Sequence, residues 1–156
     1  MLVIRRAKQE DKKSMWNVQV NSIKEICKSH YTQNELQAWL GLLKPERYKE
    51  TIESKAVFVA IDGDDVVGFG QLDQENGHIE DLYVRPDHAK RGVGMKILLT
   101  LEDVAQKSGS LLLHGNSTLN AIRFYEKAGY RVTRQKKYLL PNDMVACIHI
   151  VKKLSE

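Results

Sequence analysis

Apolar residues in the first thirty positions recur at the spacing of an α-helix, after one short extended segment. The segment Leu2–Ile4 is apolar and is followed by charged residues, which predicts a first strand. Between Asp11 and Ser29, apolar residues recur three to five positions apart, which predicts an amphipathic helix over this range. The residues that define its apolar face are Met15, Val18, Ile23 and Ile26.

Two further helices are predicted before residue 56. Thr32 and Glu35 have the spacing of a capping box, in which each side chain bonds to the backbone N–H of the other residue, so a helix should begin there. Its apolar residues are Leu36, Trp39 and Leu40. Pro45 interrupts this pattern, and the segment Glu46–Ile52 predicts another short helix.

The pattern becomes that of strands after residue 55. Ala56–Ile61 and Val66–Leu72 are rich in apolar and β-branched residues, and the segment Asp62–Asp64 between them is typical of a turn. A second turn at Asn76-Gly77 leads into Ile79–Val84. We therefore expect three consecutive antiparallel strands.

The second half of the chain alternates helices and strands. Helical spacing resumes near Val93, and Gly109 is expected to close that helix. The elements expected after it are a short buried strand Leu111–Leu113, a helix Leu119–Ala128, and the strands Tyr130–Leu139 and Met144–Val151 around the turn Pro141–Asp143. This order predicts an α/β protein of the α+β type, with a mixed, mostly antiparallel sheet and helices on both faces.

Composition and charge narrow the class of protein. The chain has 156 residues, of which 42% are hydrophobic and 28% charged, which is typical of one globular domain over residues 1–156. No apolar run approaches the roughly 20 residues of a membrane helix, and the apolar start is too short for a signal peptide. The cysteines, Cys27 and Cys147, have no metal-site or disulfide spacing, so we expect a reduced, cytoplasmic protein without a metal. The net charge is +4, but the basic residues are interspersed with acidic ones, which argues against a nucleic-acid partner.

The candidate chemistry begins in the loop after the third of these strands. Gly92 and Gly94 stand at the start of the predicted helix, where free backbone N–H groups and the helix dipole attract phosphate groups. Lys90, Arg91 and Lys96 add positive charge at the same point. A Walker loop is excluded because no Lys-Ser or Lys-Thr follows Gly94, and a Rossmann loop because its third small residue is missing. Alone, the pattern is also compatible with a tight turn that binds nothing.

A second motif lies about thirty residues later, in the predicted helix Leu119–Ala128. Ser117 or Thr118 is expected to cap this helix. Its inward residues are Ala121, Phe124 and Ala128. Tyr125 lies one position off that inward stripe, so its hydroxyl either reaches a cleft or belongs to a residue that only packs. Periodicity alone favours packing.

Together the two motifs resemble those of the GNAT superfamily of N-acetyltransferases. The cofactor motif of that family, Gln/Arg-x-x-Gly-x-Gly/Ala, is matched by residues 89–94, with Ala89 in place of the first Gln or Arg. The later motif, Asn-x-x-x-x-Phe-Tyr-Glu-Lys-x-Gly-Phe/Tyr, is matched from Asn120 to Tyr130. The resemblance covers residues 56–132 and the order of elements along the whole chain. It implies a GNAT-like fold and an N-acetyltransferase that uses acetyl-CoA as its co-substrate.

The resemblance also implies which residues bind acetyl-CoA. The strand that ends at Val84 would carry a bulge and diverge from Leu111–Leu113, and the Val84 N–H would face the thioester oxygen in the gap. The loop would bind the pyrophosphate, and Asn120 the pantetheine. Tyr125 would lie beside the sulfur as the acid for the leaving thiolate. The residues assigned to the cofactor are Leu82, Tyr83, Val84, Ala89, Lys90, Arg91, Gly92, Val93, Gly94, Met95 and Asn120.

The acceptor amine must lose a proton before it attacks, since an alkyl ammonium with a pKa near ~10 is protonated at neutral pH. Glu80 is the candidate base because strand alternation would place it on the face of Val84, and because some relatives that acetylate polyamines carry an acidic residue there. A solvated carboxylate is an equally good interpretation. His78 is a weaker candidate, and His30 and His114 are weaker again. We expect direct transfer in a ternary complex, without a covalent cysteine intermediate.

The acceptor is not identified by any motif. The first two helices should shape its site, through Ile26, His30, Tyr31, Glu35 and Trp39. We expect a small-molecule amine, because nothing in the chain indicates a long groove for a protein. The alternatives are a protein (lysine or N-terminal) acetyltransferase and a non-catalytic module that binds acyl-CoA or nucleic acid. A monomer and a homodimer are both open.

Overall fold

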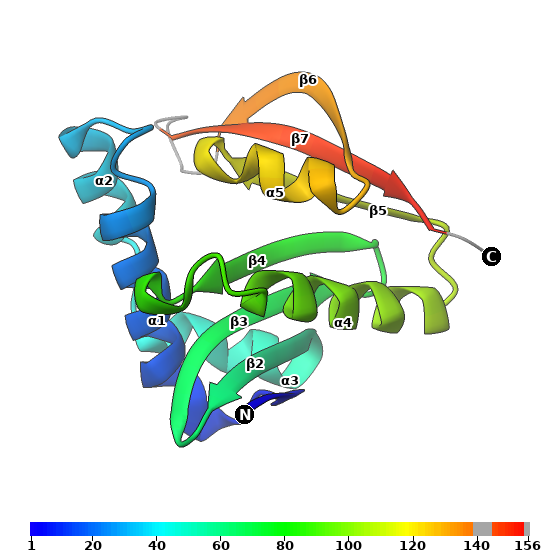
Figure 1. Ribbon diagram of the computed structural model, residues 1–156, viewed down its shortest axis with the longest axis horizontal. Helices are drawn as coiled ribbons and strands as arrows, with labels where there is room; N and C mark the ends of the chain where they lie inside the picture. The colour runs from blue at the N-terminus through cyan, green and yellow to red at the C-terminus, as the bar shows by residue number, and fades with distance from the viewer. Residues whose placement is uncertain (139–144, 155–156) are drawn as a thin grey trace.

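The computed structural model describes residues 1–138 and 145–154. Within them, seven strands form one sheet in the order β1-β2-β3-β4-β5-β7-β6 (Figure 1). Every neighbouring pair is antiparallel except β4 and β5, which are parallel. The strands are β1 (Leu2–Arg6), β2 (Ala56–Asp62), β3 (Asp65–Asp73), β4 (His78–Val84), β5 (Leu112–Thr118), β6 (Arg131–Tyr138) and β7 (Ala146–Lys153). The mixed, mostly antiparallel sheet predicted from the sequence is confirmed.

Helices cover both faces of this sheet. The α-helices are α1 (Lys12–Ile26), α2 (Gln33–Leu40), α3 (Lys49–Ser54), α4 (Val93–Lys107) and α5 (Ile122–Lys127), and the 3₁₀ segments are η1 (Gln9–Asp11), η2 (Pro45–Tyr48), η3 (Pro86–His88) and η4 (Leu119–Ala121). α4 and α5 share one apolar cluster with the sheet, and α1 and η2 share another with its opposite face. None of the helices in the described ranges is both long and apolar enough to cross a bilayer.

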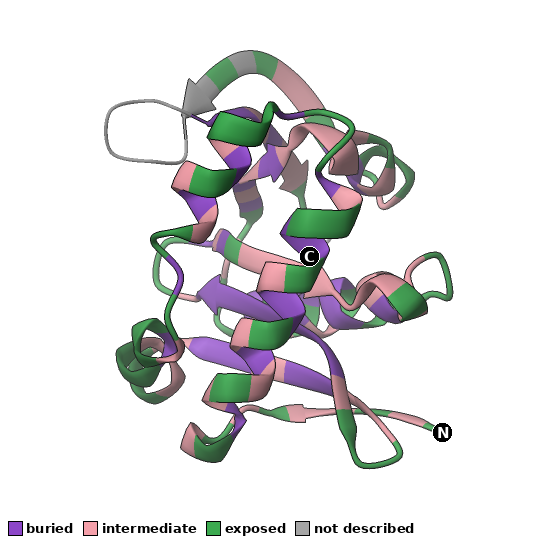
Figure 2. Ribbon diagram, turned by 90° about the vertical axis from the view of Figure 1, so that its left-hand side faces the viewer, coloured by how far each residue is buried: buried purple, intermediate pink, exposed green. Residues whose placement is uncertain are grey.

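The apolar spacing of the sequence defines the buried side of each helix. In α1, the predicted residues Met15, Val18 and Ile23 are buried, whereas the charged residues of that helix face solvent. Figure 2 shows the same division: the central strands are buried, and the helices are banded by buried and exposed residues. Burial of such a stripe removes apolar surface from water, which is the main favourable term in folding.

The predicted capping box is present at the start of α2. The Thr32 hydroxyl oxygen accepts from the Glu35 backbone N–H at 3.1 Å, and the Thr32 N–H donates to Glu35 Oε1 at 2.8 Å. Both contacts are local, so the sequence spacing alone was enough to predict where the helix begins.

The strand expected at Leu111–Leu113 is longer and less buried than predicted. β5 runs from Leu112 to Thr118, and Leu111 and Leu112 are 64% and 52% exposed. Only Leu113 of the three leucines is buried. The polar second half of β5 is extended because it pairs with β7 along its full length, a long-range contact that no local pattern reveals.

The start of the helix after β5 also differs from the prediction. The chain first makes the 3₁₀ turn η4, and Thr118 makes no side-chain capping bond. The Ser117 hydroxyl donates instead to the Thr118 carbonyl at 2.7 Å. The Leu119 N–H donates to the Tyr31 hydroxyl at 3.0 Å, so a side chain distant in sequence satisfies this backbone group. The predicted strand ends Leu139 and Met144, and the turn between them, lie outside the described residues.

Candidate active site

The sheet opens between β4 and β5. These two strands pair only at His78 with His114 and at Ile79 with Gly115, and they then diverge towards α1 and α2 (Figure 1). β4 also carries a bulge, because Asp81 and Ile79 pair with successive residues of β3 and leave Glu80 unpaired. A bulge of this kind bends a strand and redirects its side chains. The bulge and the divergence implied by the family resemblance are therefore both present.

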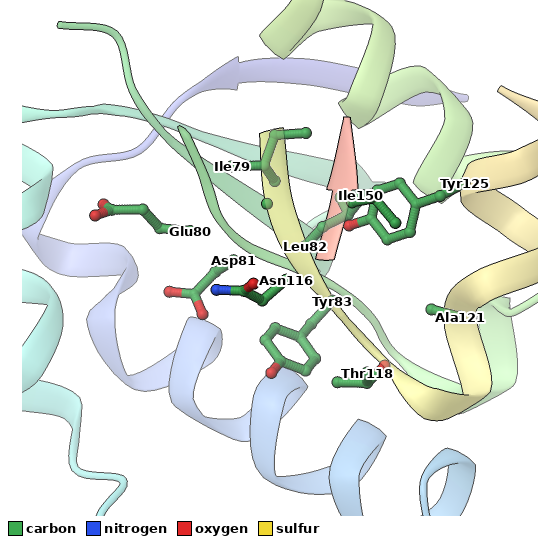
Figure 3. Close-up of a pocket in the computed structure, with 11 residues that line it drawn as sticks. Ile79, Glu80, Asp81, Leu82, Tyr83, Asn116, Thr118, Ala121, Tyr125 and Ile150 are labelled. Carbon is green, nitrogen blue, oxygen red and sulfur yellow. The ribbon is translucent and has the colours of Figure 1, made fainter. Parts of the chain in front are cut away.

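A narrow cavity occupies this opening. Figure 3 shows its lining side chains, which come from β4, β5, β7 and the start of the α5 region. They are Ile79, Glu80, Asp81, Leu82, Tyr83, Gly115, Asn116, Thr118, Ala121, Tyr125 and Ile150. Its position beside Leu82 and Tyr83, beyond the last residues that pair with β5, leaves that stretch of β4 accessible to a ligand.

The glycine loop has the backbone shape that a phosphate cradle requires. Lys90 and Gly92 have φ values of +63° and +84°, both in the left-handed region. Gly92 is the N-cap of α4, and no atom lies within 4 Å of the position that its Cβ would occupy. The first backbone N–H groups of a helix have no intrahelical partner. They are therefore available to an anion that approaches Gly92.

The two sequence motifs meet at this loop. A Cβ on Gly94 would lie 3.2 Å from Cε1 of Phe124, so α4 and α5 approach closely only because residue 94 has no side chain. Lys90, Arg91 and Gly92 are exposed, whereas Val93 is buried. The other loop residues assigned to the cofactor, Ala89, Gly94 and Met95, are half-buried.

Tyr125 both packs in the core and lines the cavity. Its ring makes edge contacts with Phe124 and Tyr130, at centroid distances of 5.1 Å and 5.5 Å. Burial, with a smaller contribution from Asp81, raises the pKa of its hydroxyl well above the ordinary value for tyrosine. The hydroxyl therefore remains a proton donor at neutral pH. Both interpretations left open by the sequence therefore apply: Tyr125 packs in the core, and it also lines a cleft.

A buried polar network fixes the far side of α5. The Tyr130 hydroxyl donates to Glu102 at 2.7 Å, and Lys152 Nζ donates both to Glu102 at 3.1 Å and to the Ala128 carbonyl at 2.8 Å. These bonds tie α4, β7 and the end of α5 together. They hold the backbone that carries Tyr125 in place.

The expectation that Glu80 shares a face with Val84 is wrong. Val84 packs toward Gly94 on the α4 side. Glu80 accepts a hydrogen bond from Gln71 Nε2 at 2.7 Å and lies 4.0 Å from Lys55. It lines a cavity on the α1 side of the sheet. The bulge at Glu80 interrupts the two-residue alternation on which the expectation rested.

This second cavity has a volume of about 240 Å³ and lies between the sheet and the first helices. It shares five lining residues with the first cavity, so the two are adjacent. Its lining residues are Gln19, Trp39, Leu42, Leu43, Arg47, Glu80, Asp81, Tyr83, Asn116 and Thr118. A small acceptor in the second cavity would thus be adjacent to a thioester in the first.

Asp81 is the site residue that sequence reasoning missed. Its side chain is only 11% exposed and lines both cavities. Burial raises the pKa of its carboxyl to about 6; the charge of Arg47 opposes this shift and that of Glu80 adds to it. Two adjacent carboxylates in a strand were a visible signal, but strict alternation would have assigned Asp81 to the face opposite Glu80.

Three buried side-chain oxygens in this region accept no hydrogen bond from the described residues: Gln71 Oε1, Asn116 Oδ1 and Asn120 Oδ1. Buried polar atoms are nearly always paired. Asn116 lines both cavities, and Asn120 belongs to the motif assigned to pantetheine. The amide N–H groups of a pantetheine arm would satisfy such acceptors, so these residues fit the cofactor.

The residues expected to shape the acceptor site divide into two groups. Only Trp39 lines the second cavity. Tyr31 is buried and joins the helices to the sheet, because its hydroxyl donates to the Ala146 carbonyl at 2.7 Å. His30 is exposed, and Glu35 serves the capping box. Ile26 is half-buried.

The remaining candidate groups lie elsewhere. The rings of His78 and His114 are tilted against each other, with 4.8 Å between their centroids, and burial together with His114 lowers the pKa of His78. Cys27 and Cys147 are buried, and burial raises the pKa of the Cys27 thiol to about 12. Such a thiol is not a nucleophile at neutral pH.

Comparisons with known proteins agree with this geometry. Residues 27–139 match the family model described as the acetyltransferase (GNAT) domain. The uncharacterized N-acetyltransferase YjcF of Bacillus subtilis (strain 168) is 35% identical over 118 residues, which cover 74% of this chain and 84% of that protein.

Solved structures share the fold. A GCN5-related N-acetyltransferase from Rhodopseudomonas palustris matches with a TM-score of 0.89 and 26% identity over 97% of this chain and 95% of that one. The PaiA N-acetyltransferase of Thermoplasma acidophilum, solved with coenzyme A, has a TM-score of 0.83 at 20% identity over 99% of each chain. The family match, the split sheet and the glycine loop lead to one conclusion: the chain belongs to the GNAT family of acetyl-CoA-dependent N-acetyltransferases.

Proposed function

We propose that this enzyme transfers the acetyl group of acetyl-CoA to a primary amine of a small molecule, by direct attack in a ternary complex. The observation that carries the proposal is the adjacency of the two cavities, which share Asp81, Tyr83 and Asn116 among their lining residues. We assign the first cavity to the end of the pantetheine arm, and the second is bordered by α1, α2 and η2. A compact acceptor fits this arrangement better than a protein chain does.

The cofactor would be held along β4 and at the start of α4. Acetyl-CoA supplies the activated thioester when it is bound. The backbone N–H groups around Gly92 bind its pyrophosphate, and Asn120 bonds to its pantetheine arm. The Val84 backbone, beyond the last residues that pair with β5, is the candidate donor to the thioester oxygen. The remaining cofactor contacts are proposed for Leu82, Tyr83 and residues 89–95.

The proton of the acceptor amine would pass to a carboxylate at the bulge. Glu80 is the candidate predicted from the sequence, but it is held by Gln71 and lies near Lys55. Asp81 faces both cavities and has fewer competing contacts, its nearest cation being Arg47 at 4.0 Å. We assign the role of base to Asp81 and retain Glu80 as the alternative.

Tyr125 would protonate the leaving thiolate. Its ring is held by two neighbouring aromatic rings and its hydroxyl keeps its proton at neutral pH, which suits a general acid. The amine nitrogen forms a bond to the acetyl carbon and loses a proton to solvent as it becomes the amide, the carbon–sulfur bond breaks, and the thiolate takes the proton of the Tyr125 hydroxyl. Solvent then restores that proton.

The direct test is release of free CoA thiol from acetyl-CoA in the presence of a panel of small primary amines. We expect thiol release that depends on the amine and an acetylated product detectable by mass spectrometry. Lysine-containing peptides and proteins with free N-termini serve as the competing acceptors. Acetylation confined to those would overturn the small-molecule assignment.

A further inference from the structure

Arg47 is a cation inside the second cavity. It belongs to η2, the turn that follows α2, and among the described residues that line the cavity it alone carries a permanent positive charge. Its side chain lines the cavity and is 40% exposed. The proton transfer proposed above makes no use of this cation.

The Arg47 side chain is held in place by neutral groups. Its Nη1 donates to Gln19 Oε1 at 3.0 Å, and its guanidinium carbon lies 5.4 Å from the centre of the Tyr48 ring. The Tyr48 hydroxyl donates to the same Gln19 oxygen, which fixes the amide from the other side. An arginine held in this way loses little conformational entropy when a ligand binds.

The charge of Arg47 is only weakly compensated by the protein. Its one ion pair with the described residues, to Asp81 Oδ2, spans 4.0 Å and uses the same Nη1 that bonds to Gln19. A guanidinium has five N–H donors arranged as a fork that matches carboxylate and phosphate oxygens. Donors on its other nitrogens therefore remain for a ligand in the cavity.

The charges of the cavity are arranged in a way that suits one kind of ligand. Glu80 and Asp81 lie at the thioester side, where an ammonium group would be attracted, and Arg47 supplies a cation. The volume of about 240 Å³ lies below the roughly 300–1,000 Å³ typical of drug-sized ligand sites. These features favour a compact acceptor with a positive and a negative group.

We propose that Arg47 binds an anionic group of the acceptor, so that the substrate is a small amine that also carries a carboxylate or a phosphate. This inference rests on the proposed function, since it assumes that the second cavity holds the acceptor. Arg47 is a specificity-determining residue in this proposal. It orients the acceptor so that the amine lies beside Asp81.

The test compares acceptors that differ only in the anion. One pair is an amino acid and its amide, and the second is an amino sugar phosphate and the unphosphorylated amino sugar. For the wild-type enzyme we expect kcat/KM to favour the anionic member of at least one pair by roughly ten- to a hundredfold, as a charge-assisted bidentate contact would. The pair that shows the preference identifies the anion as carboxylate or phosphate.

Arg47→Met should remove this preference, mainly through KM for the anionic acceptor, and leave KM for acetyl-CoA unchanged. Arg47→Lys retains the charge without the fork and should restore only part of the preference. Lys44→Met is the matched control, because Lys44 is an exposed cation just before η2 and does not line the cavity. Equal kcat/KM for both members of each pair, or a preference that persists in Arg47→Met, would overturn the proposal.

A binding measurement separates this inference from the proposed function. Calorimetric titration of the CoA-bound enzyme with each acceptor requires no turnover. Tighter binding of the anionic member to the wild type, lost in Arg47→Met at unchanged CoA affinity, supports the role of Arg47 even if no amine in the panel is acetylated. Binding that Arg47→Met leaves intact overturns it, whether or not thiol is released.

Discussion

At the scale of single residues, Tyr125 and Tyr130 form a natural comparison. Both are buried tyrosines of the second motif, and their rings contact each other at 5.5 Å. Only Tyr125 lines the cavity, whereas the Tyr130 hydroxyl is committed to Glu102. The Tyr125 hydroxyl is therefore the candidate for proton transfer, whereas the Tyr130 hydroxyl stabilises the fold.

Tyr125→Phe should lower the single-turnover rate by about 10²-fold, at the low end of the range for general acids because CoA is a fairly good leaving group. Affinity for acetyl-CoA should change little, because the ring and its packing are kept. Tyr130→Phe should show the opposite: a near-normal rate, with unfolding free energy lowered by roughly 1–3 kcal/mol, because the hydrogen bond to the charged Glu102 is lost and only Lys152 still pairs with that carboxylate. A Tyr125→Phe enzyme with the wild-type single-turnover rate would show that solvent, and not Tyr125, protonates the leaving thiolate.

The carboxylates of the bulge can be distinguished by pH. Burial raises the pKa of Asp81 to about 6, and a base must be ionised to take a proton. The wild-type kcat/KM should therefore rise with pH through about 6, with a further rise near the higher pKa of the acceptor amine. Asp81→Asn should remove the first rise and lower kcat/KM by about 10²–10⁴-fold.

Glu80→Gln is the control for this measurement. It should keep the rise near pH 6 but move it to a somewhat lower pH, because the negative charge of Glu80 contributes to the raised pKa of Asp81. A profile in which Glu80→Gln loses that rise and Asp81→Asn keeps it would transfer the role of base to Glu80.

At the scale of elements, the loop before α4 combines a strained backbone with an open surface. Gly92 has φ +84° and Gly109, just past the other end of the same helix, has φ +88°. At both glycines, no atom lies within 4 Å of the position that a Cβ would occupy. A side chain at either position would thus meet the same backbone strain without a clash.

Gly92→Glu should abolish acetyl-CoA binding, because the carboxylate would repel the phosphates and block their approach to the N–H groups of α4. Gly109→Glu should cost the same roughly 1–2 kcal/mol of left-handed strain and bind acetyl-CoA normally. Both proteins should keep a wild-type far-UV circular dichroism spectrum. Normal acetyl-CoA binding by Gly92→Glu would show that the loop is a turn without a role in binding the cofactor.

At the scale of the whole molecule, the proposed cofactor site joins the two parts of the sheet that diverge between β4 and β5, and the helices beside them. β4 and β5 share only two residue pairs, and α4 and α5 meet beside Gly94. A ligand that bridges these parts binds the folded chain and not the unfolded one, so it stabilises the fold by mass action.

Acetyl-CoA at one hundred times its dissociation constant should stabilise the protein by ~2.7 kcal/mol, which corresponds to roughly 5–10 °C in Tm for a chain of this size. Differential scanning calorimetry measures the shift. Gly92→Glu should show none at the same concentration. Absence of a shift in the wild type at millimolar acetyl-CoA would contradict the cofactor assignment.

Local features of the sequence were sufficient for much of this fold and for the cofactor motifs. The capping box at Thr32, the strands of the β2–β4 meander and the glycine loop each depend on residues a few positions apart. The hydrophobic period and the residue preferences of turns act between residues a few positions apart, so they can be recognised in the sequence. The motif from Asn120 to Tyr130 likewise predicted that Tyr125 could reach a cleft, and it lines one.

The acceptor side of the site was decided by tertiary structure. The bulge at Glu80 arises from the register of β4 on β3, and it ended the alternation that made Glu80 a partner of Val84. Arg47 and Asp81 are distant in sequence and come within 4.0 Å only when η2 packs against the sheet. Contacts of this kind depend on how separate elements pack against each other, whereas a pattern along the chain reveals only interactions between residues close in sequence.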